Sequence, residues 1–317
     1  MKRYEVSVQQ AEGYETFVLS DRATNAEARI VPALGNNVYS FSVNGEQLLL
    51  VPPSLAELKE KPSRFGVPIL FPPNRTAYGT FSYEGRTYTF PPNNDAHYIH
   101  GELCRRCWAA ESSQANETEG ASLVSVFRFA DHPDIIRAFP HPYTFRLTYR
   151  LAEGRLELEG EVHNGGTEKA PFGLGFHPYF SSTEDATVVV PANTEYAVQD
   201  TFVAGLPAVT GLSAAYRTGV PAREIEPSGY KLFRMEDGVN RSEIRLPASG
   251  TTIVYETDAA FPFMVVFKPH WGASISLEPY SIVTDGFNLP WPAEVTGVRG
   301  VDGGVTVRFH TSIYKES

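Results

Sequence analysis

The 317-residue sequence lacks the features that mark several large classes of protein. It contains only two cysteines, Cys104 and Cys107, so no disulfide framework holds the fold together. No run approaches the roughly 18 apolar residues that a membrane-spanning helix requires. No basic run offsets the net charge of −10, which argues against a nucleic-acid partner. We therefore expect neither a membrane nor a nucleic acid as a partner.

The amino-terminal segment has no apolar stretch of the kind found in signal peptides. Lys2 and Arg3 are followed by residues 4–10, which alternate in polarity. The expected location is therefore the cytoplasm.

Helical periodicity is also scarce, whereas alternating polar and apolar residues recur along most of the chain. Such alternation is typical of half-buried strands, and the 26 glycines and 24 prolines favour frequent turns between them. A hairpin is expected at residues 81–90, turning at Glu84 and Gly85, and one helix at residues 54–60, capped by Ser54. The other expected strands are residues 4–8, 15–19, 28–31, 37–43, 47–51, 122–129, 143–149, 156–162, 187–190, 251–255, 263–267, 274–277 and 305–309.

This excess of strands over helices predicts an all-β protein. No break in composition and no fixed-period repeat divides the chain, so we expect a single domain over residues 1–317. Residues 203–227, rich in Gly, Ala and Pro, are expected to form a long connection on one face of a large β-sandwich; a linker is the alternative.

Polar side chains stand at the ends of several apolar strands, each next to Pro or Gly. Asn74 and Arg75 follow the stretch 65–73, and the Arg fork of donors suits vicinal hydroxyls or carboxylates. His100 precedes Gly101. The alternative for Arg75 is a surface arginine near a turn.

His177 lies within an apolar and aromatic stretch, residues 173–180, and is followed by Pro178. The residue before a proline is driven into extended geometry, so His177 is expected to end a strand or begin a loop. That position suits acid/base chemistry on a ring-shaped ligand. The alternative is a hydrogen-bonded core or turn histidine.

Glu278 ends an apolar strand and also precedes a proline, Pro279. Burial would raise the pKa of such a carboxyl from about 4.3 towards neutrality, which suits a general base. The alternative is a strand-end glutamate paired with an arginine. In a sandwich, strand ends on one side can converge on a shared cleft.

A zinc site is a further possibility for the segment 97–107. His97 and His100 are spaced as one ligand pair, and Cys104 and Cys107 as another. All four would have to surround one ion within eleven residues, so two free thiols are the favoured interpretation, and no metal is expected.

Four sequence blocks together resemble the aldose 1-epimerase (galactose mutarotase) family. The blocks are Gly-Val-Pro-Ile-Leu-Phe-Pro-Pro-Asn-Arg at 66–75, His-Gly at 100–101, Gly-Phe-His-Pro-Tyr-Phe at 175–180 after Asn164, and Leu-Glu-Pro at 277–279. They occur in the family's order over roughly residues 30 to 290. The resemblance implies a large antiparallel β-sandwich of the galactose mutarotase type, a supersandwich. It also implies interconversion of the α and β anomers of a free aldohexose, without a cofactor.

The resemblance implies a role for each matching residue. Glu278 would take the proton from the C1 hydroxyl, and His177 would protonate the ring oxygen. His100 would assist near the ring oxygen, while Asn74 and Arg75 would bind sugar hydroxyls. Aromatic neighbours are expected to stack on the C–H face of the sugar; they are Tyr179, Phe180 and Trp271.

The sequence departs from the family pattern at one binding position. The family's sugar-binding aspartate, between the second histidine block and Leu-Glu-Pro, has no clear match; Asp237 is the nearest candidate and Asp200 another. The family also contains members that act on phosphorylated hexoses, for which basic groups are needed; Arg64 and the pair at 105–106 are candidates. A carbohydrate-binding sandwich without turnover is the alternative from another class.

Overall fold

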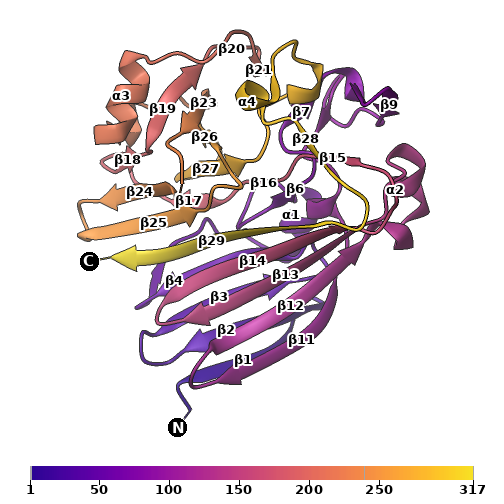
Figure 1. Cartoon of the computed structure of the whole chain (residues 1–317). Helices are drawn as coiled ribbons and strands as arrows, with labels where there is room; N and C mark the ends of the chain where they lie inside the picture. Colours follow the sequence, from indigo (N-terminus) through magenta and orange to yellow (C-terminus); the bar gives the residue numbers. More distant parts are fainter. Residues whose placement is uncertain (1, 239, 317) are drawn as a thin grey trace.

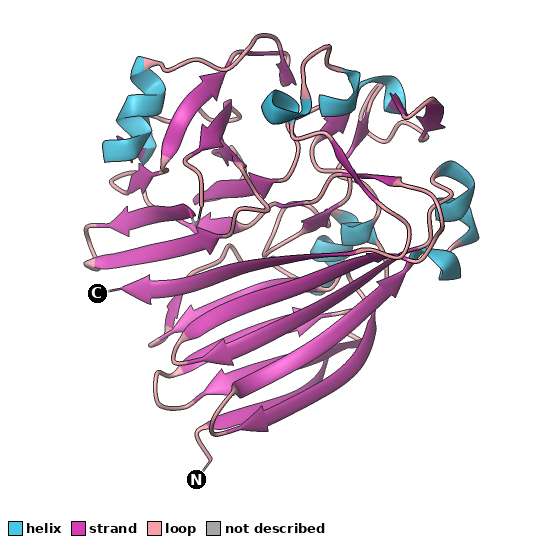
Figure 2. Cartoon of the chain, viewed as in Figure 1, coloured by secondary structure: helices cyan, strands magenta, loops and turns pink. Residues whose placement is uncertain are grey.

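The computed structural model describes residues 2–238 and 240–316, and most of this chain is antiparallel β-structure (Figures 1 and 2). The helices are short and lie around the sheets (Figure 2). The all-β prediction is confirmed. No helix in the described ranges has the length and hydropathy needed to cross a membrane.

The largest sheet has nine strands in the order β11-β12-β13-β14-β29-β25-β24-β18-β22. Its strands are β11 (Ala109–Asn116), β12 (Gly120–Arg128), β13 (Tyr143–Ala152), β14 (Arg155–Asn164), β29 (Thr306–Glu316), β25 (Thr251–Thr257), β24 (Asn240–Leu246), β18 (Thr187–Val189) and β22 (Val220–Pro221). The last strand of the chain, β29, lies between β14 and β25, so it joins two halves of the sheet that are distant in sequence (Figure 1).

A five-stranded meander packs against the first part of this sheet. It contains β1 (Tyr4–Ala11), β2 (Tyr14–Asp21), β3 (Ala26–Val31), β4 (Asn37–Val43) and β5 (Glu46–Gln47). Along β13, buried and partly exposed residues alternate strictly, as expected for a strand with one face in the core. Leu19 and Phe41 of the meander share one core cluster with Phe145 of β13, each fully buried. Each such side chain contributes about 1.5–3 kcal/mol of burial free energy.

A seven-stranded sheet positions two of the polar residues singled out above, Glu278 and His177. Its path is β19 (Ala192–Tyr196), β23 (Tyr230–Met235), β26 (Phe263–Phe267), β27 (Ser274–Tyr280), β16 (Gly175–Phe176) and β6 (Ile69–Leu70), and β17 (Tyr179–Ser181) also pairs with β27. Every residue of β27 is buried. Because β16 pairs with both β27 and β6, three sequence blocks separated by about a hundred residues each meet here.

The remaining elements are small. They are the pairs β7 (Arg75–Thr76) with β10 (Tyr98–Ile99), β8 (Thr80–Tyr83) with β9 (Arg86–Thr89), β15 (Ala170–Phe172) with β28 (Arg299–Val301) and β20 (Val198–Gln199) with β21 (Phe202–Val203). The α-helices are α1 (Leu55–Glu60), α2 (Pro133–Ala138), α3 (Gly211–Thr218) and α4 (Ala293–Thr296). The 3-10 helices are η1 (Ala77–Gly79), η2 (Leu103–Arg105), η3 (Phe129–Asp131), η4 (Ala222–Glu224) and η5 (Gly286–Asn288).

Several local predictions are confirmed and others are wrong. The helix capped by Ser54 and the hairpin turning at Glu84 and Gly85 are present. The segment 203–227 is not a plain loop: it contains α3, which begins with a capping box at Thr210. Strands β11, β23 and β24 were not expected, because charged and polar residues interrupt their alternation.

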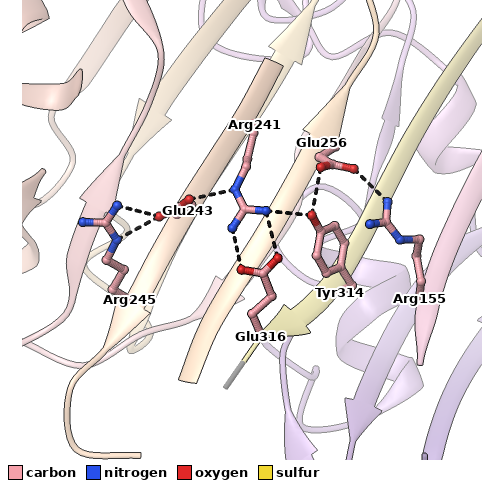
Figure 3. Close-up of polar contacts among 7 residues, drawn as sticks. All are labelled: Arg155, Arg241, Glu243, Arg245, Glu256, Tyr314 and Glu316. Carbon is pink, nitrogen blue, oxygen red and sulfur yellow. Dashed lines mark hydrogen bonds and ion pairs between the residues drawn. The ribbon is translucent and has the colours of Figure 1, made fainter. Parts of the chain in front are cut away.

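A ladder of charged side chains crosses one surface of the nine-stranded sheet (Figure 3). Arg241 of β24 lies between Glu243 at 2.8 Å and Glu316 of β29 at 2.7 Å. Arg155 of β14 pairs with Glu256 of β25 at 2.7 Å. These pairs are partly exposed and individually weak, but as a network they connect β29 to β24 and, across β29, connect β14 to β25.

Candidate active site

One open cleft of about 540 Å³ brings together five of the six candidate site residues. This volume lies within the range of roughly 300–1,000 Å³ that is usual for small-molecule sites. The five residues are Asn74, Arg75, His100, His177 and Glu278.

His177 lies between β16 and β17, where Pro178 interrupts the strand, as predicted from the sequence. Gly175 pairs with Tyr280 and Tyr179 pairs with Ser276, so the intervening His177 lies opposite the middle of this part of β27. A Cβ on Gly175 would be 2.4 Å from the Tyr280 ring, so only glycine permits this close approach. The register of β27 therefore decides which side chain faces His177.

Glu278 is that side chain, and its Oε1 lies 3.3 Å from His177 Nε2. It is an interior residue of β27, paired with Val265, and the expectation that it ends a strand is wrong because pairing continues to Tyr280. The Tyr280 hydroxyl donates a hydrogen bond to Glu278 Oε2. Burial raises the pKa of Glu278 to about 8, and the hydrogen bonds and Arg75 only partly oppose this.

The hydrogen bonds of Ser276 determine which ring nitrogen of the neutral His177 carries the hydrogen. The Ser276 hydroxyl donates to the Pro178 carbonyl at 2.8 Å, and its oxygen lies 2.8 Å from His177 Nδ1. With its single hydrogen already donated, Ser276 accepts from Nδ1–H. Nε2 is thus the nitrogen left to accept a proton, beside Glu278 Oε1 and the Tyr179 hydroxyl, each at 3.3 Å. Burial lowers the pKa of His177 to about 3.

The pairing of β7 with β10 positions Asn74, Arg75 and His100. Arg75 lies opposite Ile99, and the His100 amide donates to the Asn74 carbonyl at 2.9 Å. Asn74 Oδ1 accepts from Arg75 Nη1 at 3.4 Å and from its amide at 2.9 Å, which orients the guanidinium. Gly101 has φ +64°, and a Cβ there would lie 1.8 Å from the Phe71 carbonyl oxygen, so glycine is required.

His100 packs against His177 with ring centroids 5.3 Å apart. Burial lowers the pKa of His100 well below its usual value, and the neighbouring His177, Arg75 and Arg105 add to the effect. The buried Nδ1 of His100 has no hydrogen-bond partner within the described residues. The residue lines the cleft beside His177, although its Nδ1 atom is shielded from solvent.

An aromatic wall forms one side of the cleft. Tyr179 stacks on His177 with centroids 4.6 Å apart and planes at 15°, and Trp271 follows at 6.2 Å from Tyr179. Phe267 contacts both His177 and Trp271. The expectation that Phe180 faces a sugar is wrong: it is fully buried and packs against Tyr255, because successive strand residues point to opposite faces.

Asp237 does not line the cleft, and its proposed binding role is corrected. Its side chain is 99% exposed and lies 3.8 Å from Arg234, because it follows the end of β23 on the surface. Asp200 is at the turn of the β20–β21 hairpin, where only the next residue, Thr201, lines the cleft. Within the described ranges, the other cleft carboxylate besides Glu278 is Glu60.

The zinc arrangement does not form. Cys104 is buried in the core, Cys107 is exposed, and His97 packs between Tyr78 and Phe202. No group of three or more metal-ligating side chains gathers anywhere in residues 2–238 and 240–316.

Several cleft residues were missed by the sequence reasoning. They include Glu60, Lys61, Ser63, Asn93, Asn94, Thr201, Ser228, Tyr230 and Phe267. Most come from loops, whose direction no periodicity reports. Ser276 could have been found, since it lies two residues from Glu278 on the same face of a predicted strand.

Three comparisons with known proteins concern the family and the fold of this chain. A family model described as aldose 1-epimerase matches residues 17–296. The protein YphB of Escherichia coli (strain K12), described as uncharacterized, is 26% identical over 229 residues, 68% of this chain and 73% of YphB.

The structural likeness is close at low sequence identity. A galactose mutarotase-like protein from Clostridium acetobutylicum superposes with a TM-score of 0.92 at 23% identity, covering 100% of both chains. A galactose 1-epimerase from Lactobacillus acidophilus NCFM gives a TM-score of 0.81 at 14% identity, covering 99% of both. The fold is thus of the galactose mutarotase type, as predicted.

Proposed function

Because the chain belongs to the aldose 1-epimerase family, a family of isomerases, we propose that it is a mutarotase. It interconverts the α and β anomers of an aldohexose by opening and reclosing the sugar ring. The observation that supports this most directly is the buried pair of Glu278 Oε1 and His177 Nε2, 3.3 Å apart in the cleft.

Ring opening requires one proton to be removed and one to be delivered. Glu278, as the carboxylate, takes the proton from the C1 hydroxyl, and His177, protonated at Nε2, gives its proton to the ring oxygen. The C1–O5 bond breaks and the C1 carbonyl forms. After rotation about C1–C2, the O5 hydroxyl attacks the other face, its proton returns to His177, and Glu278 protonates the former carbonyl oxygen. Glu278 and His177 together hold one transferable proton throughout this cycle.

Burial favours the proton on Glu278 over His177, because it raises the pKa of the carboxyl and lowers the pKa of the imidazole. Attraction between the two charges, 3.3 Å apart, opposes this preference and stabilises the ion-pair form that ring opening requires.

Neighbouring groups orient the sugar and the imidazole. Arg75, held by Asn74, donates to sugar hydroxyls, and the His100 imidazole lies beside His177 near the ring oxygen. Tyr179 and Trp271 stack on the C–H face. Ser276 is a positioning residue, since it keeps the second proton of His177 on Nδ1.

The test is equilibration of freshly dissolved α-glucose and α-galactose, followed by polarimetry or NMR. Acceleration over buffer that disappears in Glu278→Gln and His177→Asn, with both variants folded by circular dichroism, is the expected result. Equilibration no faster than buffer for every sugar tried would refute the proposal.

A carbohydrate-binding sandwich without turnover is the alternative that the same experiment addresses. Binding needs no acid/base pair, so the retention of both Glu278 and His177 disfavours it. Sugar binding by calorimetry without any acceleration would establish it instead. A cytoplasmic location and the absence of a cofactor stay predictions.

An epimerase acting on a hexose phosphate is the second candidate. It is favoured by one observation: Arg64 and Arg105, singled out from the sequence as phosphate ligands, both line the cleft.

A further inference from the structure

Three polar side chains follow one another on the same face of β27. Ser276, Glu278 and Tyr280 are two positions apart, and the pairing of β27 with β26 is regular from Phe267 to Phe263. Ser276 holds Nδ1 of His177, and Glu278 faces its Nε2. Tyr280, which takes no part in the proton transfers, is fully buried beside Glu278.

The two oxygens of the Glu278 carboxyl have different partners. The Tyr280 hydroxyl donates to Oε2, whereas Oε1 lies 3.3 Å from His177 Nε2. Burial raises the pKa of Tyr280 well above its usual value, and the neighbouring Glu278 adds to this, so the hydroxyl keeps its proton and acts as the donor. Oε1 is therefore the oxygen left to exchange a proton with a sugar.

The ring of Tyr280 is held firmly on the opposite side from the cleft. It belongs to a buried cluster with Leu70, Phe263 and Val265, and its edge packs against the backbone of Gly175, where a Cβ would lie only 2.4 Å away. A donor that is fixed in this way before the reaction needs no reorganisation when charge develops on its acceptor.

This hydrogen bond favours the ionised form of Glu278. Burial raises the pKa of the carboxyl, and the Tyr280 hydroxyl is the largest of the influences that oppose the increase, ahead of Ser276 and Arg75. Ring opening requires the carboxylate, so the hydroxyl stabilises the form in which Glu278 acts as a base.

The other titratable groups near Glu278 come from β7, β17, β23 and the β16–β17 link. They are Arg75, Tyr179, Tyr230 and His177. The Tyr230 hydroxyl bonds to Thr284, and the Tyr179 hydroxyl pairs with His177 Nε2. Within the described residues, the donor to Oε2 is thus Tyr280.

We propose that Tyr280 is a positioning residue for the base: its hydroxyl holds Oε2 of Glu278, directs Oε1 towards His177 and the sugar, and stabilises the carboxylate during ring opening. The inference rests on the proposed mutarotase function and adds a residue that acts through Glu278.

Tyr280→Phe tests this in the reaction, because it removes the hydroxyl and keeps the ring. With whichever of glucose and galactose the natural protein accelerates, kcat from anomer-exchange NMR should fall about 10- to 100-fold with little change in KM, the usual effect of losing a hydrogen bond to a charged group. The fall of kcat/KM at alkaline pH should begin about one to two pH units higher, because Glu278 and His177 hold their shared proton more tightly.

A direct titration of Glu278 tests the same contact without any substrate. In protein labelled with ¹³C at the glutamate side-chain carboxyls, the Glu278 signal is the one that Glu278→Gln removes. Its midpoint should rise from about 8 to about 9–10 in Tyr280→Phe. The site-specific replacement of Tyr280 by 3-fluorotyrosine, a more acidic phenol and a stronger donor, should lower the midpoint instead.

The matched control is Tyr149→Phe. Tyr149 is equally buried, on β13 and outside the cleft, and its hydroxyl donates to the Asn36 carbonyl at 2.7 Å. Its loss should leave the Glu278 midpoint and the alkaline fall of kcat/KM where they are in the natural protein.

An unchanged Glu278 midpoint in Tyr280→Phe would overturn the inference, and so would an equal shift in Tyr149→Phe. Slower turnover with an unmoved alkaline fall would also overturn it, since that is the result of a merely structural defect. If Tyr280→Phe does not fold, the 3-fluorotyrosine protein decides, and a midpoint that is not lowered refutes the inference. If the natural protein accelerates no sugar, the mutarotase proposal fails, while the titration still decides whether Tyr280 holds the carboxylate.

Discussion

Replacing Glu278 by Gln should abolish catalysis and yet stabilise the protein at alkaline pH. The substitution keeps the shape of the side chain but removes a carboxyl whose pKa is about 8 in the folded protein and about 4.5 in the unfolded chain. Between these values the folded state holds a proton that the unfolded state has lost. The stability of the natural protein therefore falls as pH rises through this interval, by about 1.4 kcal/mol per pH unit.

The size of this stability difference depends on the pH interval over which it is measured. Between pH 6 and pH 8 the natural protein should lose about 2–3 kcal/mol relative to Glu278→Gln, which has no group to titrate there. The low pKa of His177 acts in the opposite sense, with stability lost as pH falls from 6.5 towards 3, and mostly below this range. Activity should drop about 100-fold or more, the usual contribution of a general base.

Urea unfolding of both proteins at pH 6 and pH 8 measures this difference directly. The control is Glu60→Gln, which removes an exposed carboxylate at the same cleft and should give the same stability difference at both pH values. A pH-independent difference between the natural protein and Glu278→Gln would show that the carboxyl is not desolvated, and the proton-sharing mechanism would be wrong.

Three further outcomes are expected. The value of kcat/KM should be constant from about pH 4 to pH 7 and fall about tenfold per pH unit above pH 8, because Glu278 and His177 then lose the one proton that they share. A rise of kcat/KM above pH 8 in buffer-corrected polarimetry would contradict this. Ser276→Ala should lower kcat about tenfold or more with little change in KM, because Nδ1 of His177 loses its hydrogen-bond acceptor. An unchanged pH–rate profile would argue against a positioning role for Ser276. Asp237→Asn should leave kcat and KM within about twofold of the natural protein, because the side chain lies in solvent, and a larger change in steady-state kinetics would restore it as a site residue.

The secondary structure could largely be predicted from the sequence. Alternation identified most of the long strands, including β13 and β14, because the side-chain period of a half-buried strand is fixed at two. Pro178 placed His177 outside the strand interior, which depends only on the steric demands of the following proline. Strands such as β23 were missed because charged residues, here the partly exposed Lys231 and Arg234, interrupt the alternation.

The composition of the site was only partly predictable. Matching motifs gave Asn74, Arg75, His100, His177 and Glu278, which the fold does bring into one cleft. Asp237 was chosen for its position between two motifs, and sequence separation carries no information on which way a surface turn points.

The sequence by itself determined the strand-rich character of the chain and the choice of the candidate acid/base side chains, since both depend on residue type and on neighbours a few positions away. Only the tertiary structure decided that Glu278 faces His177, because this depends on the register of β27 against β16 and β17. The same packing buries both groups, which shifts their pKa values, and places the Arg64 guanidinium over the ring of Trp271, more than two hundred residues away in the chain. Burial and charge pairing are properties of the folded surface, and so no local pattern could have shown them.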